Sequence, residues 1–122
     1  MKLHLARIDK QNAFTGYGEG YVLVNARRYE HSLLVMPGQL IENWDVSDFS
    51  ALRDDQISFL VGLNMEIILL GTGGELRFPR PSLLQPLAVA GIGVEVMNTR
   101  AACRTYNVLL AEGRNVAAAL IL

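Results

Sequence analysis

The sequence predicts a three-layer α/β fold, in which helices pack on a mixed central β-sheet and an antiparallel hairpin precedes them. Two observations carry this prediction. From residue 50 onward, segments with helical spacing alternate with short apolar runs, which is typical of parallel strands connected by helices. Before residue 37, two stretches rich in β-branched and aromatic residues follow one another closely, which is typical of a hairpin.

The predicted hairpin pairs residues 17–24 with residues 28–36. Asn25, Ala26 and Arg27 lie between them and form a plausible turn. The run Leu33–Met36 is continuously apolar, so we expect that end of the second strand to be buried on both faces. Pro37 and Gly38 then stop it.

The second part of the chain is predicted to contain three helix–strand units. Ser50 is a fair N-cap for a helix that Gly62 or Asn64 closes, and a buried strand follows at 67–70. Ser82 is expected to cap a second helix that runs to about Ala90, with a strand at 92–97 after it. A third helix is predicted at 99–112 and a last strand at 116–121.

Length and composition bound the class of protein. The 122 residues are expected to form one domain, 1–122, and 51% of them are apolar, which is too many for a disordered tail. Apolar runs fall short of the roughly 18–20 residues of a membrane span, and charges come too early for an export signal. Cys103 is the only cysteine, so an intrachain disulfide is impossible. We therefore expect a soluble, cytoplasmic protein without membrane insertion.

Charge and histidine content argue against two kinds of partner. The net charge of −1 lacks the basic footprint of a nucleic-acid-binding protein, although nine of the eleven basic residues are arginine. His4 and His31 are the only histidines, and neither belongs to a metal-ligand spacing. We expect no nucleic acid, no metal and no cofactor.

A glycine-rich turn is the first candidate site. Gly71, Thr72, Gly73 and Gly74 follow the predicted strand at 67–70, where backbone N–H groups can point at an anion. The dinucleotide fingerprint fails because Leu76 stands where its third glycine belongs, and no phosphate-loop motif is present. A tight turn that needs positive φ is the alternative interpretation.

The second candidate lies at the start of the predicted helix at 99–112. Asn98 or Thr99 caps this helix, and its free N–H groups attract anions. Arg100 and Arg104 add positive charge one turn apart. If the two preceding strands are parallel neighbours, both candidate segments meet at one edge of the sheet, where open α/β sheets bind ligands. Structural capping alone is the alternative.

Four further residues could carry chemistry or structure. Glu95 is a charge inside an apolar strand, so it needs an ion-pair partner or an exposed edge, with acid or base catalysis as the other possibility. Tyr106 is expected in the core with its hydroxyl paired, and Asn107 in contact with a neighbouring backbone. Cys103 is expected to be a buried small hydrophobe that reacts slowly.

The C-terminal part of the chain resembles a known family. The motif runs from Leu70-Gly71-Thr72-Gly73 through Met97, Thr99, Tyr106 and Asn107 to Glu112-Gly113-Arg114, followed by an alanine-rich strand. It is similar to the Mth-nine-three-eight-like family, a domain of unknown function with relatives that include a mitochondrial assembly factor for respiratory complex I and an adipogenesis-associated protein. The resemblance implies a three-layer α/β fold with a mixed sheet and no established catalytic residues.

Two functional hypotheses remain. The first is a non-enzymatic binding or assembly-type factor with another protein as its partner, because no catalytic constellation is evident. The second is a site for a small anionic ligand, possibly enzymatic, where the glycine turn and residues 98–104 meet. A concave site with convergent N–H groups favours the second, and a flat apolar patch favours the first.

Overall fold

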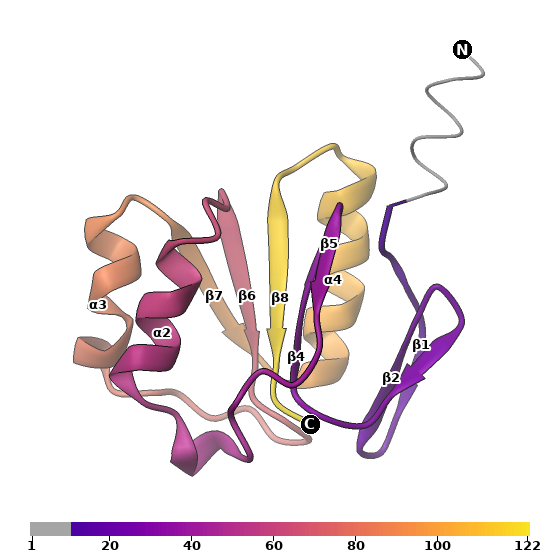
Figure 1. Ribbon diagram of the computed structural model, residues 1–122, viewed down its shortest axis with the longest axis horizontal. Helices are drawn as coiled ribbons and strands as arrows, with labels where there is room; N and C mark the ends of the chain where they lie inside the picture. The colour runs from indigo at the N-terminus through magenta and orange to yellow at the C-terminus, as the bar shows by residue number, and fades with distance from the viewer. Residues whose placement is uncertain (1–10) are drawn as a thin grey trace.

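The computed structural model describes residues 11–122, and Figure 1 shows its arrangement. The first strands are β1 (Phe14–Gly18), β2 (Tyr21–Val24) and β3 (Arg27–Tyr29), which form a small antiparallel sheet. A second, five-stranded sheet has the order β5-β4-β8-β6-β7. It is built from β4 (Leu33–Met36), β5 (Gln39–Ile41), β6 (Ile67–Gly71), β7 (Gly93–Met97) and β8 (Val116–Leu120). This sheet is mixed, because β8 runs parallel to β6 and antiparallel to β4.

Helices and the small sheet cover the two faces of the central sheet. On one face lie α2 (Asp54–Val61) and α3 (Pro81–Val89), with a short 3-10 turn, η1 (Phe49–Ala51), before α2. On the other face lie α4 (Thr99–Ala111) and the small sheet, whose Phe14, Val22 and Val24 join the same core as Tyr106. The predicted three-layer α/β fold with a mixed central sheet is therefore confirmed.

Period-two alternation explains how β4 and β8 serve both cores. Leu34 and Met36 face the α2 and α3 side, whereas Leu33 and Val35 face α4. All four residues of β4 are buried, as their continuous apolar run predicts. The small alanines of β8 let layers approach closely from both faces, since every residue of this strand is buried.

The N-terminal hairpin differs from the prediction. Residues 17–24 do not form one strand, because Gly20, at φ +78°, turns the chain between β1 and β2. Residues 28–36 also divide, into β3 of the small sheet and β4 of the central sheet. The predicted turn is present at Asn25 and Ala26, which both have positive φ, but Arg27 belongs to β3.

Two predicted helix caps are also wrong. Ser50 lies inside η1, where Asp48 accepts the capping hydrogen bond from the Ala51 N–H, and α2 begins only at Asp54. Ser82 lies inside α3, which begins one residue earlier at Pro81. Proline suits that first position because its φ is already helical and the missing N–H has no helical partner there.

Candidate functional site

The two candidate segments lie side by side, as the alternation of strands and helices predicts. Strands β6 and β7 are parallel neighbours, so their carboxyl ends share one edge of the sheet. The Gly73 N–H donates to Thr99 Oγ1 at 2.9 Å, and the Thr99 N–H donates to the Gly73 carbonyl at 2.9 Å. The glycine turn and the start of α4 are thus bound directly to each other.

This junction is closely packed. A Cβ atom on Gly71 would stand 2.7 Å from Leu120 Cδ2 and 3.2 Å from Thr99 Cα, so only glycine lets α4 approach β6 this closely. The Thr99 hydroxyl, almost fully buried, also donates to the Ile121 carbonyl at 3.0 Å. Because its hydrogen is used in this way and its oxygen receives the Gly73 N–H, Thr99 ties three segments together.

The side chains of Thr72 and Asn98 likewise form hydrogen bonds with nearby backbone groups. The Thr72 hydroxyl donates to the Glu75 carbonyl at 2.6 Å and receives the Arg77 N–H at 3.2 Å. Asn98 Oδ1 accepts the Ala101 N–H at 2.8 Å, which identifies Asn98 as the cap of α4. Gly73 has φ +97°, the left-handed conformation that the alternative interpretation of the turn requires.

A cavity of about 450 Å³ opens beside this junction. Its walls come from the β1–β2 turn, the glycine turn, the start of α4 and the residues after β8. They include Gly73, Gly74, Asn98, Thr99 and Arg100, together with Tyr17 and Glu19. Arg100 is exposed, so its guanidinium is free to meet solvent or a ligand. Arg104 does not line this cavity, and its Nη1 donates to the Tyr17 hydroxyl at 2.9 Å.

Glu95 lies on β7, at the edge of the central sheet, opposite Leu69 of β6. Its side chain is exposed, and no ion pair involves it among residues 11–122. The expected ion pair is therefore absent from the part of the chain that the structure describes. An edge strand lets the carboxylate reach water, which is the other solution that the sequence allowed.

Tyr106 and Asn107 connect α4 to the N-terminal strands. The Tyr106 hydroxyl donates to the Asn12 carbonyl at 2.8 Å, and its ring meets Phe14 edge to face. Asn107 accepts the Phe14 N–H at 2.9 Å and donates to the Phe14 carbonyl at 2.7 Å, as an added strand residue would. Both side chains thus hold the small sheet against α4.

Cys103 is buried on the apolar face of α4, as predicted, with 1% of its surface exposed. Desolvation raises the pKa of its thiol to about 12, and the nearby Arg104 guanidinium opposes this shift only in part. Burial also raises the pKa of Tyr106. A thiol in this state is protonated at neutral pH and is a poor nucleophile.

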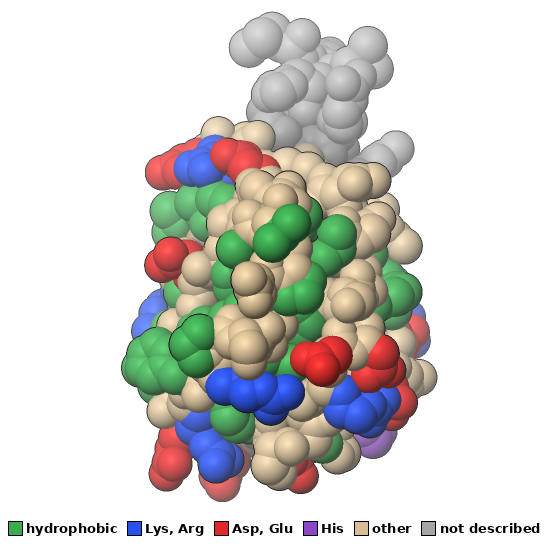
Figure 2. All heavy atoms as spheres, turned by 90° about the vertical axis from the view of Figure 1, so that its left-hand side faces the viewer, with side chains coloured by type: hydrophobic (Ala, Val, Ile, Leu, Met, Phe, Trp, Pro, Cys, Tyr) green, Lys and Arg blue, Asp and Glu red, His purple; other side chains and the backbone are tan. Residues whose placement is uncertain are grey.

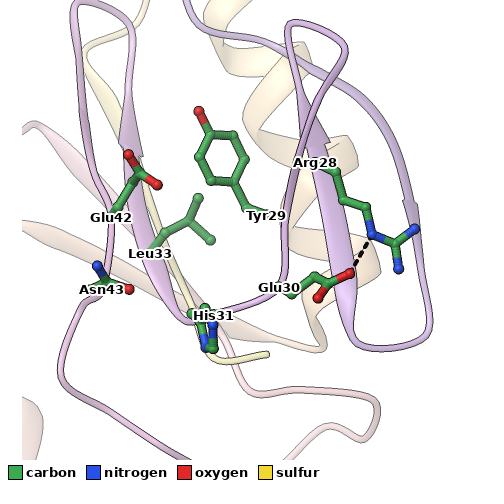
Figure 3. A pocket seen from close by; sticks show the side chains of 7 residues that line it. All are labelled: Arg28, Tyr29, Glu30, His31, Leu33, Glu42 and Asn43. Atoms are coloured by element: carbon green, nitrogen blue, oxygen red, sulfur yellow. Dashed lines mark hydrogen bonds and ion pairs between the residues drawn. The ribbon is translucent and has the colours of Figure 1, made fainter.

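A separate cavity of about 280 Å³ lies between the β3–β4 connection and the end of β5. Figure 3 shows Tyr29, Glu42 and His31 around it, together with Glu30, which forms an ion pair with Arg28 at 2.6 Å. Within residues 11–122 there is no group of three His, Cys, Asp or Glu side chains placed to hold a metal ion. His4 lies outside the described residues.

Sequence reasoning missed an apolar surface formed by α3, β7 and the loop before α3, which we call the α3–β7 surface. Figure 2 shows hydrophobic side chains gathered on this side of the molecule. Phe78 is 72% exposed and Val89 79% exposed, and a groove of about 620 Å³ runs between the helix and the strand. The groove is lined by Phe78, Pro79, Pro81, Ser82, Leu84, Gln85, Ala88 and Val96. The apolar residues Leu76 and Phe78 inside a proline-bounded loop were the available signal.

The chain belongs to a protein family of conserved fold. Residues 14–121 match the family described as "Protein of unknown function (DUF498/DUF598)". A solved structure from Bordetella pertussis, described as a Mth-nine-three-eight-like domain, is 31% identical, has a TM-score of 0.80, and is matched over 94% of this chain and 86% of its own. The resemblance identified from the glycine turn and the α4 motif is thus confirmed.

Relatives of known name span nearly the whole chain. A protein of Francisella tularensis named "13 kDa major membrane protein" is 32% identical over 99% of both chains. The human protein named NADH dehydrogenase [ubiquinone] 1 alpha subcomplex assembly factor 3 is 32% identical over 98% of this chain and 68% of its own length. A crystal structure from Bordetella parapertussis is 39% identical, with a TM-score of 0.85 and coverage of 91% and 95%.

These comparisons overturn the predicted cytoplasmic location. Besides the Francisella membrane protein, a structural neighbour from Bartonella henselae is described as an outer membrane protein, with 31% identity, a TM-score of 0.79 and coverage of 93% of this chain and 96% of its own. No helix within residues 11–122 has the length and apolarity to cross a membrane. The prediction rested on the lack of such a span and of an export signal, and neither observation fixes the compartment.

Proposed function

We propose that this protein is a non-enzymatic binding factor of the assembly type, which holds a protein partner on its α3–β7 surface. The observation that carries the proposal is the exposure of Phe78 and Val89 beside an apolar groove. Exposing large apolar side chains to water is unfavourable, and apolar surface patches commonly mark protein-binding sites. The assembly role named for the human relative supports the same class of function.

The polar residues of the family motif support this proposal from the opposite direction. The side chains of Thr72, Thr99 and Asn107 donate hydrogen bonds to backbone carbonyls of the fold. Cys103 is buried and protonated, and the Tyr106 hydroxyl is bound to a backbone carbonyl. These polar residues therefore hold the fold together, whereas Phe78 and Val89 expose most of their surface to solvent.

Site-specific photo-crosslinking in living cells tests the proposal. A photoreactive residue replaces Phe78 in one variant and the exposed Arg27, on the small sheet, in a matched control. We expect crosslinks from position 78 to a subunit of a larger complex, present early in a pulse-chase experiment and lost once that complex matures. Equal crosslinking from position 27, or no time-dependent partner at position 78, contradicts an assembly-type function.

A second candidate function is the binding of a small anionic ligand in the cavity beside Gly73 and Asn98. The specific observation in its favour is that the cavity of about 450 Å³ brings the glycine turn, the N-terminus of α4 and the exposed Arg100 together. Phosphate titration followed by amide NMR tests it. Saturable shifts at Gly74 and Arg100 that vanish in Arg100→Ala support a site, whereas even shifts over the whole surface contradict it.

A further inference from the structure

We infer that the edge of β7 binds an extended strand of a partner protein, in which apolar residues alternate with lysine or arginine. This inference rests on the proposed function and specifies how the α3–β7 surface would hold its partner. Strand β7 is the last strand of the central sheet on its side, and within residues 11–122 no segment pairs with its outer edge. An unpaired edge is a template for strand addition.

The hydrogen bonds of β7 show which backbone groups are free to pair. The Gly93 N–H donates to the Glu66 carbonyl at 3.0 Å, and the Met97 carbonyl accepts the Thr72 N–H at 2.9 Å. In a parallel ladder the N–H and C=O of one residue point to the same side, and this side alternates along the strand. Gly93 and Met97 therefore turn toward β6, whereas Val94 and Val96 turn their N–H and C=O groups outward.

The side chains of β7 define what an added strand would meet on each face. Val94 and Val96 pack toward α3, and Val96 lines the apolar groove with Phe78 and Leu84. Every second side chain of an added strand would continue this apolar surface. The remaining side chains would lie on the α4 face beside Glu95, whose carboxylate is exposed and has no ion-pair partner within residues 11–122. A lysine or arginine opposite Glu95 complements its charge.

The same carboxylate argues against a second copy of this chain as the occupant. Antiparallel pairing of two copies over the whole of β7 would be two-fold symmetric, and Glu95 is the central residue of Gly93–Met97. The two Glu95 side chains would then lie directly opposite each other, and like charges in that arrangement destabilise the pair. Glu95 thus deters self-pairing at this edge while it favours a basic partner strand.

Amide NMR with two synthetic peptides tests the inference on the full chain. Both peptides have blocked ends, and valine alternates with lysine in one and with glutamate in the other. We expect the lysine peptide to shift the amides of Val94 and Val96 and to bind about tenfold more tightly than the glutamate peptide. Equal affinities, or shifts centred on another surface, would overturn the inference.

Three variants and a control for charge sharpen the test. Val94→Pro removes an outward N–H that the fold does not use, and it should weaken lysine-peptide binding about tenfold, whereas Val94→Ala keeps that N–H and should bind nearly as the parent does. Glu95→Lys should reverse the order of the two peptides. Glu112→Lys makes the same charge change at the exposed end of α4 and should leave the order intact. If Val94→Pro fails to fold, the contrast between Glu95→Lys and Glu112→Lys decides the question alone.

Three further outcomes bear on this inference and on the function on which it rests. Crosslinking to an assembly partner at position 78, together with peptide binding that Val94→Pro does not weaken, keeps the proposed function and overturns strand addition. Sedimentation showing a dimer of the parent that Val94→Pro abolishes would assign the edge to a second copy and overturn the basic partner strand. Specific lysine-peptide binding without any crosslinked partner would keep the edge site and count against the assembly function.

Discussion

The junction of β6 with α4 and the α3–β7 surface differ in how far their residues are packed and hydrogen-bonded within the fold. At the junction, Gly71 and Thr99 are in close contact and the threonine hydroxyl bridges three segments. At the α3–β7 surface, Phe78 and Val89 are mostly exposed and the backbone edge of β7 is open. Polar residues of the motif thus hold the fold together, whereas large apolar side chains stay exposed at the surface.

The largest effect is expected where the junction leaves no room. Gly71→Val would force side-chain atoms into Leu120 and the backbone of Thr99, so we expect a loss of unfolding free energy of about 3 kcal/mol. Urea denaturation measures it. Gly74→Val is the matched control, because nothing lies within 4 Å of the position of its Cβ. Similar losses for both variants would show that glycine is required at position 71 by the conformation of the turn, and not by the close approach of α4.

Removing the bridging hydroxyl should have the next largest effect. Thr99→Val keeps the shape of the side chain but leaves the Gly73 N–H and the Ile121 carbonyl without their partner. Unsatisfied buried groups cost roughly 1–3 kcal/mol each, so we expect a loss of about 2 kcal/mol in urea denaturation. Thr15→Val, which removes an exposed hydroxyl that accepts the Ala26 N–H, should cost clearly less. If Thr99→Val leaves stability unchanged, the fold does not depend on the Thr99 hydroxyl, and a role of this hydroxyl in ligand binding would be favoured.

Alkaline pH should weaken the core beneath the junction through Cys103. Its pKa is about 12 in the folded protein, above the roughly 8.5 of an unfolded thiol, so unfolding releases a proton between these values. The contribution of the thiol to stability is therefore complete below about pH 8.5 and is lost as the pH rises toward 12, by about 2 kcal/mol at pH 10. The slope of stability against pH should flatten in Cys103→Ala. If the parent protein and Cys103→Ala show the same slope of stability against pH, the thiol is not desolvated and its pKa is not raised by burial.

The smallest effect on stability is expected at the exposed surface. Phe78→Ser removes a ring that is 72% exposed, so the free energy of unfolding should change by less than about 0.5 kcal/mol. The same variant should lose the partner crosslinked through a photoreactive residue at Val89, which keeps position 78 free for the substitution. Leu83→Ser, at a buried position of α3, is the contrasting case and should destabilise the fold strongly. If Phe78→Ser destabilises the protein as Leu83→Ser does, the ring belongs to the core and the surface is not a free docking site.

The sequence determined the secondary structure of the C-terminal half with few errors. Alternation of apolar runs with helical spacing located β6, α3, β7, α4 and β8, and Asn98 and Gly113 marked the ends of α4. Local chemistry controls these features, because a cap or a chain-reversing glycine acts within a few residues. The same reasoning misplaced the starts of α2 and α3, since several residues in each loop could serve as the cap.

The order of strands in the sheet and the exposure of side chains could not be predicted from the sequence, because both depend on how the layers pack. The sequence left Glu95 between an ion pair, a catalytic role and an exposed edge, and the strand order places it on an exposed edge because β7 is last in the sheet. The sequence also predicted one hairpin over residues 17–36, whereas packing divides these residues between two sheets. The physical reason is that burial depends on contacts between segments far apart in sequence. A local pattern specifies which face of a strand is apolar, but only the assembled layers decide whether anything covers it.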